Sequence, residues 1–118
     1  MPAIRHIAIY AEDPSAVAEF YKTTFGMKEV NRRSEEAGGS IFVSDGYVNL
    51  AILRANGQPE GLYHFGFQVE DAMAIGRAAK EAGAAQQMSP RPAGRYAEFR
   101  LHDPVGSPID ISEHGWDV

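Results

Sequence analysis

The sequence contains no cysteine among its 118 residues, which excludes disulfides, thiolate nucleophiles and zinc–thiolate sites. Lysine and arginine form no cluster beyond Arg32-Arg33, and the formal net charge is -5. A nucleic-acid-binding protein would carry a basic patch, so we expect no nucleic-acid partner. No apolar run approaches the roughly 18 residues of a membrane helix, and we expect no membrane partner. The lack of cysteine and the short, polar N-terminus indicate a cytoplasmic protein.

The remaining composition is ordinary for a globular protein, with 44% apolar and 23% charged residues. The length predicts a single domain. A chain of this size buries roughly 65% of its unfolded surface, which is enough for a core of its own.

Two stretches of the chain nearly repeat each other. Residues 5–13 read RHIAIYAED, and residues 63–71 read YHFGFQVED. In each copy a histidine, His6 or His64, opens an alternating apolar run that closes on Glu-Asp. A helical pattern follows each copy and ends near a glycine. Internal similarity of this kind predicts two halves with the same fold, with the two histidines at matching positions.

Hydrophobic periodicity predicts eight strands and two helices. The strands are expected over residues 3–11, 27–34, 40–44, 47–54, 62–69, 86–89, 95–102 and 107–112. The helices are expected from Asp13-Pro14 to Gly26 and over 72–82, with Asp13 and Asp71 capping their first amides. The chain is therefore predicted to be α+β, with two βαβββ modules over about 1–54 and 62–118 and a linker over 55–61.

The first and last strands of each half alternate between apolar and polar side chains. Their apolar positions are expected to pack under the helices, and the other face carries His6, Asn49, His64 and Asp110. Alternation of this kind is typical of an antiparallel sheet with one covered and one free face. The neighbours on the free face are alanine, glycine and serine, which leave room for a pocket.

Two imidazoles and one carboxylate suit a divalent Ni, Zn, Fe or Mn ion and leave positions open for a substrate. His6, His64 and Asp110 are the predicted metal ligands, and Asn49 is a fourth oxygen ligand or a hydrogen-bond donor to substrate. A metal in an open site polarises a carbonyl and stabilises an oxyanion. Two alternatives stay open: the histidines are hydrogen-bonded core residues, or Glu113 replaces Asp110.

Three further residues are candidates for substrate binding. Tyr10 and Gln68 follow the two histidines on the same faces, where they either line the pocket or only pack on the sheet. Arg95, with Arg91, flanks a Pro/Gly-rich loop and either clamps an anionic substrate or stays in solvent.

The segments RHIAIYAEDPSAVAEFYKTTFGM, YHFGFQVED and AEFRLHDPVGSPIDIS resemble the vicinal oxygen chelate superfamily. Its members include glyoxalase I, methylmalonyl-CoA epimerase, extradiol dioxygenases and the fosfomycin- and bleomycin-resistance proteins. The resemblance implies two βαβββ modules in a U-shaped half-barrel, a divalent metal at its centre and a homodimer. It places the ligands at His6, Asn49, His64 and Asp110.

Departures from the family pattern bear on the activity. Glyoxalase I has a glutamate where this chain has Asn49, and the epimerase has His, Gln, His and Glu at the four positions. We expect a metal-dependent lyase or isomerase that binds a small oxygenated substrate through two oxygens, with Asp110 as both ligand and base. The alternatives are a metal-free binding protein of the bleomycin-resistance type and an extradiol-type dioxygenase.

Overall fold

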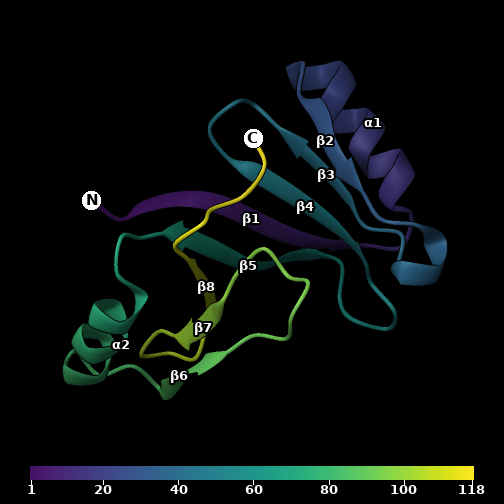
Figure 1. The fold of residues 1–118 in the computed structure, drawn as a ribbon. Coiled ribbons are helices and arrows are strands. Elements are labelled where there is room, and N and C mark those ends of the chain that lie inside the picture. Colours follow the sequence, from purple (N-terminus) through teal and green to yellow (C-terminus); the bar gives the residue numbers. More distant parts are fainter. The chain divides into compact units, whose positions relative to one another are not determined.

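A computed structural model describes residues 1–118 and shows eight strands and two α-helices (Figure 1). In chain order the elements are β1 (Ala3–Ala11), α1 (Pro14–Phe25), β2 (Lys28–Arg32), the 3-10 turn η1 (Glu35–Ala37), β3 (Ile41–Ser44), β4 (Asn49–Arg54), β5 (Gly61–Gln68), α2 (Ala72–Glu81), β6 (Gln86–Pro90), β7 (Phe99–His102) and β8 (Pro108–Ser112). The order βαβββ therefore occurs twice, and the predicted α+β class is confirmed. Neither helix is long and apolar enough to cross a membrane.

The chain divides into two compact units, which are described separately. The first unit contains His6–Tyr63 and Asp117–Val118, and the second contains Met1–Arg5 and His64–Trp116. Each unit holds one helix and one set of four strands. The predicted single domain, with modules over about 1–54 and 62–118, stays a prediction.

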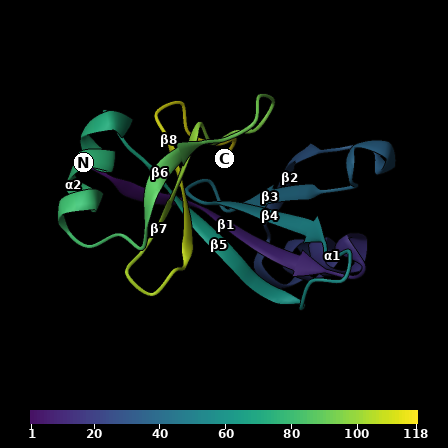
Figure 2. The ribbon, with the colours of Figure 1, turned by 90° about the horizontal axis from the view of Figure 1, so that it is seen from below.

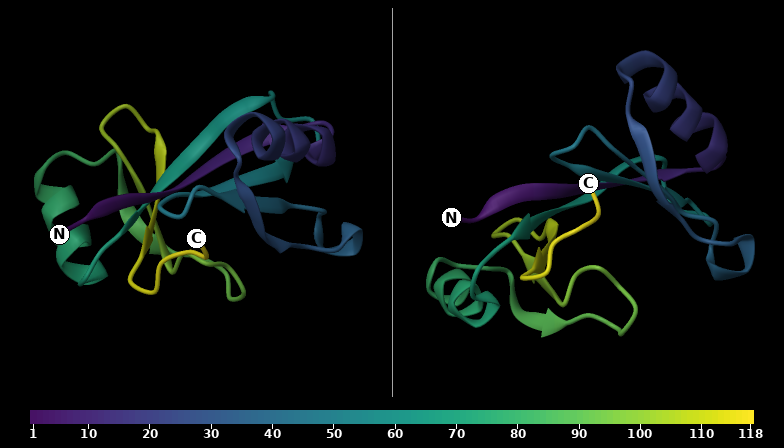
Figure 3. Two further views of the ribbon diagram at one scale, coloured as in Figure 1. Left: turned by 90° about the horizontal axis from the view of Figure 1, so that it is seen from above. Right: turned by 45° about the horizontal axis from the view of Figure 1, so that its top comes forward.

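In the first unit the strand order is β2-β3-β4-β1, with β1 and β4 parallel and the other pairs antiparallel. Helix α1 packs on β3 and β4. The core of this unit joins apolar side chains of β1, α1, β3 and β4, among them Ile9, Val43 and Ile52. The η1 turn lies within the connection between β2 and β3 (Figure 3).

The second unit repeats this plan with the order β5-β8-β7-β6, in which β5 and β8 are parallel. Helix α2 packs on β6 and β7, and the core contains Val69, Leu101 and Ile111. Figure 2 shows β6, β7 and β8 of this unit from below. The histidine-bearing strand of each unit is therefore paired in parallel with the last strand of its own module.

Local signals set the ends of both helices as predicted. Asp13 accepts a hydrogen bond from the amide of Ala16, and Asp71 accepts one from Ala74. These side chains satisfy amides that the first helical turn leaves without partners. Gly26 ends α1 in the left-handed region, at φ 70°.

Two strands begin two or more residues later than predicted. Asp45 accepts hydrogen bonds from the amides of Tyr47 and Val48, so β4 begins at Asn49 and not at residue 47. Strand β7 begins at Phe99 and not at residue 95. Just before β7, the Glu98 carboxylate accepts hydrogen bonds from the hydroxyl of Ser112, the last residue of β8, and from the amide of Glu113.

Candidate functional site

In the first unit, His6 and Asn49 stand opposite each other in the parallel pairing of β1 and β4. Both are buried, Asn49 completely. The Nδ2 atom of Asn49 donates to the carbonyl oxygen of Asp117 at 2.8 Å, so its Oδ1 atom faces His6. His6 therefore donates from Nδ1 to that oxygen at 3.0 Å. This tautomer leaves the lone pair on Nε2, which is how a neutral imidazole serves as a ligand or base.

In the second unit, Asp110 lies between two buried basic side chains. The Nε atom of Arg100 donates to Oδ1 of Asp110 at 2.7 Å, and Nε2 of His64 lies 3.1 Å from Oδ2. The Nη2 atom of Arg100 also donates to Nδ1 of His64 at 3.4 Å. The three side chains form a closed cluster, which we call the His64–Arg100–Asp110 cluster.

The surroundings of Asp110 keep it ionised. Burial favours the neutral acid, but the hydrogen bonds from His64 and Arg100 and the positive charges beside it outweigh that effect and lower the pKa of Asp110 to about 2. Asp110 is therefore a carboxylate throughout the physiological range. A carboxyl group with so low a pKa is suited to holding a cation and is a weak general base.

Arg100 is the functional candidate that the interpretation of the sequence missed. It stands opposite Asp110 in the antiparallel pairing of β7 and β8. The sequence did carry a signal, because strands were predicted over residues 95–102 and 107–112, and the short connection between them fixes the register of the hairpin. Each β7–β8 pair has residue numbers that add up to 210, so the partner of Asp110 follows from the position of the turn.

The structure places the remaining predicted residues as follows. Tyr10 stacks on Tyr63 within the first unit, with ring centroids 4.6 Å apart. Arg95 is exposed in the connection between β6 and β7. Glu113, the alternative to Asp110, accepts a hydrogen bond from the amide of Ala72 at the start of α2. The predictions that Tyr10 and Arg95 contact a substrate stay predictions.

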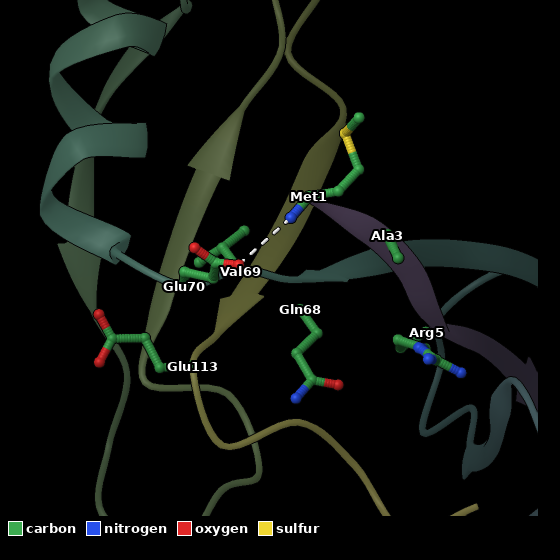
Figure 4. A pocket seen from close by; sticks show the side chains of 7 residues that line it. All are labelled: Met1, Ala3, Arg5, Gln68, Val69, Glu70 and Glu113. Carbon is green, nitrogen blue, oxygen red and sulfur yellow. Dashed lines mark hydrogen bonds and ion pairs between the residues drawn. The ribbon is translucent and has the colours of Figure 1, made fainter.

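Gln68 lines an open groove of about 410 Å³ in the second unit. Figure 4 shows the seven residues around it: Met1, Ala3, Arg5, Gln68, Val69, Glu70 and Glu113. The N-terminal amine pairs with Glu70 at 3.5 Å on one side. Gln68 is on the same face of β5 as His64, four residues further along the strand.

The comparisons with known proteins agree with this fold. The model of the glyoxalase-like domain family matches residues 6–112, which is most of the chain. The chain belongs to the glyoxalase-like domain family, within the vicinal oxygen chelate superfamily. The resemblance predicted from the sequence is thereby confirmed.

One relative and two solved structures illustrate the range of the family. Uncharacterized protein PA2024 of Pseudomonas aeruginosa is 27% identical, over 94% of this chain and 88% of its own. Methylmalonyl-CoA epimerase from Mycobacterium tuberculosis is 16% identical with a TM-score of 0.71, over 92% of this chain and 85% of its own. The 2,3-dioxygenase LapB from Pseudomonas sp. KL28 is 18% identical with a TM-score of 0.72, over 98% of this chain and 41% of its own. At identities this low, the similarity to the two solved structures shows a shared fold and nothing about activity.

The donor atoms of the second unit are compatible with a divalent metal. Nε2 of His64 and Oδ2 of Asp110 are 3.1 Å apart, which is the separation of two ligands on one ion with bonds of ~2.1 Å. Imidazole and carboxylate both suit a first-row metal. In the first unit, His6 has its Nδ1 proton bound by Asn49, an arrangement that is usual for metal-ligating histidines.

Proposed function

We propose that this protein is a divalent-metal-dependent isomerase or lyase that binds a small oxygenated substrate through two oxygens. The observation that carries the proposal is the pairing of an ionised Asp110 with the imidazole of His64 at 3.1 Å. The family and its fold support this class, since an epimerase has the same fold.

In this proposal His64 and Asp110 hold the metal, and His6 is the third ligand predicted from the sequence. A bound divalent ion would polarise a substrate carbonyl and stabilise the negative charge that forms when a neighbouring proton is removed. Asn49 accepts the Nδ1 proton of His6 and so keeps the Nε2 atom of that ring in the form that can bind a metal. The low pKa of Asp110 favours its role as ligand over its predicted role as base.

A metal-free binding protein is the second candidate, and Arg100 is the observation that favours it. The guanidinium gives the buried Asp110 a counter-charge without any metal, at 2.7 Å. A buried carboxylate without such a partner would be costly. In this alternative the His64–Arg100–Asp110 cluster only stabilises the fold, and the protein sequesters a ligand without a metal. The predicted homodimer and the cytoplasmic location stay predictions in both cases.

The metal content of protein purified without chelator tests the first proposal against the second. We expect about one Ni, Zn, Fe or Mn ion per chain. The variant His64→Ala should lose that metal while its circular dichroism spectrum stays unchanged. Unchanged metal stoichiometry in this variant would contradict the assignment of His64, and the absence of metal in the wild type would favour the binding protein.

The reaction class is tested with the metal-loaded protein in D₂O. Methylmalonyl-CoA is a direct probe, because an epimerase of this fold must remove and return the proton beside a carbonyl. Solvent deuterium incorporated at that carbon would support the isomerase. Oxygen consumption with a catechol, dependent on iron, would instead identify an extradiol-type dioxygenase.

A further inference from the structure

Arg100 contacts both residues that are proposed to hold the metal in the second unit. Its Nε atom donates to Asp110 at 2.7 Å and its Nη2 atom donates to His64 at 3.4 Å. Arg100 is buried on β7, with 9% of its surface exposed, so water screens its charge weakly. A guanidinium stays protonated at every physiological pH, so this positive charge is permanent.

At Asp110 the guanidinium and a divalent cation would compete for the same carboxylate. Arg100 occupies Oδ1, and only Oδ2 faces His64. The two positive charges would also repel each other in a poorly screened setting. Both effects oppose metal binding, although the carboxylate itself is a suitable ligand.

At His64 the same side chain selects the tautomer. Arginine has five donors and no acceptor, so the Nδ1 atom that faces Nη2 must carry the lone pair. The ring proton is then on Nε2, which donates to Oδ2 of Asp110. A cation at Nε2 would move this proton to Nδ1, where it would face a donor of Arg100. Arg100 therefore opposes a metal at both donor atoms.

The contrast with His6 makes this arrangement specific. Asn49 accepts from Nδ1 of His6 and keeps the lone pair on Nε2. The two histidines at matching positions of the repeat are thus held in opposite tautomers by neighbours of opposite hydrogen-bonding character. In this arrangement Nε2 of His6 carries the lone pair that a cation needs, whereas Nε2 of His64 carries a proton.

We propose that Arg100 is a positioning residue that competes with the divalent cation for His64 and Asp110 and thereby sets the metal affinity of the site. The proposal rests on the proposed metal-dependent function. In the metal-free protein Arg100 satisfies both side chains, so the site remains ordered when the metal leaves. Metal uptake then requires the hydrogen bond from Nη2 of Arg100 to Nδ1 of His64 to break.

The test measures metal affinity in the stripped protein, by competition of Ni²⁺ and Zn²⁺ with a chromogenic chelator. Arg100→Gln removes the charge and should bind metal about tenfold more tightly than the wild type. Arg100→Lys keeps the charge but replaces the two donor nitrogens of the guanidinium with one on an unbranched side chain, so its affinity should lie between the two. Arg77→Gln, an exposed position on α2 with the same change in net charge, should stay within about twofold of the wild type.

The outcomes separate this inference from the proposed function. Equal or weaker binding by both Arg100 variants, with a wild type that binds, would overturn the competition and leave the metal-dependent function intact. Binding by Arg100→Gln but not by the wild type would support the competition and overturn that function. If none of the proteins binds metal, both are overturned.

A second measurement needs no variant and so does not depend on their folding. Nitrogen-15 chemical shifts of the metal-free wild type report the tautomer of each imidazole. We expect His6 protonated on Nδ1 and His64 protonated on Nε2. A neutral His64 protonated on Nδ1 would overturn the proposal.

Discussion

Asn49 joins His6 to the C-terminal segment: its Oδ1 accepts from Nδ1 of His6 at 3.0 Å, and its Nδ2 donates to the carbonyl of Asp117 at 2.8 Å. Both polar ends of this fully buried amide therefore have partners. The amide is fixed at one end by a backbone group, so it can fix the imidazole at the other. Asn49 thereby links the orientation of the His6 ring to the backbone of the C-terminal segment.

Asn49→Ala should lower metal affinity by about 10- to 100-fold, because His6 loses the acceptor that holds its ring and tautomer. Asn49→Asp keeps an acceptor for Nδ1 but loses the donor to the carbonyl of Asp117, so its loss of affinity should be smaller than that of Asn49→Ala. Chelator competition with Ni²⁺ measures both. Equal losses in the two variants would show that the amide acts on His6 through packing and not through this hydrogen bond.

Asp110→Ala should lower the free energy of unfolding of the metal-free protein by about 3 kcal/mol, because the buried charge of Arg100 loses its carboxylate counter-charge. The double variant with Arg100→Met should lose less than the sum of the two single variants, since neither charge remains. Urea denaturation in the presence of a chelator measures these values. Strict additivity would contradict a direct pair.

Glu29→Gln should destabilise the protein by about 1 kcal/mol at neutral pH, and the difference should shrink to a small fraction of this value as the pH approaches 2. Hydrogen bonds from Arg32 and Lys22 lower the pKa of Glu29 from 4.5 to about 2. A lowered pKa stabilises the folded state above the unfolded-state pKa, and this contribution is lost as the pH falls from about 4.5 towards 2. Unfolding curves measured across this range should converge, whereas Glu36→Gln, an exposed acid with the same charge change, should show little difference.

Gly115→Ala should destabilise the protein by about 2 kcal/mol or more, because two effects coincide there. The backbone φ of Gly115 is +82°, and an added Cβ would lie 2.7 Å from Oε1 of Gln68. Gly57→Ala is the matched control, with a φ of +87° and no atom within 4 Å of the added Cβ. The difference between the two melting temperatures isolates the contact with Gln68; equal shifts would mean that Gln68 simply moves away.

The repeated βαβββ order followed from the sequence because its signals are local. Alternating apolar residues, the Asp13 and Asp71 caps and the glycine near each helix end act within a few residues of their position. Such signals determine the type and order of the elements. They also placed His6 and His64 correctly on the first strand of each module.

The partners of the candidate residues were harder to predict, because they come from distant parts of the chain. Asn49 bonds to a backbone carbonyl, a group that every residue carries and that therefore leaves no trace in a sequence. Arg100 was accessible through the register of the β7–β8 hairpin, but its strand was predicted to start at residue 95, where Arg95 was taken as the arginine of interest. The structure brings Arg100 to the cluster and leaves Arg95 exposed.

The parallel pairing of β1 with β4, and of β5 with β8, has a consequence for how the chain folds. His6 and Asn49 are 43 residues apart, and Gly66 and Asp110, which pair in the other unit, are 44 residues apart. The entropy of closing a loop grows only with the logarithm of its length, so the two closures cost the same. The entropy of loop closure therefore favours neither unit, and a difference between their folding rates would have to come from local features such as the longer α1 with its glycine cap. A chain with two such equivalent closures can begin to fold in either half.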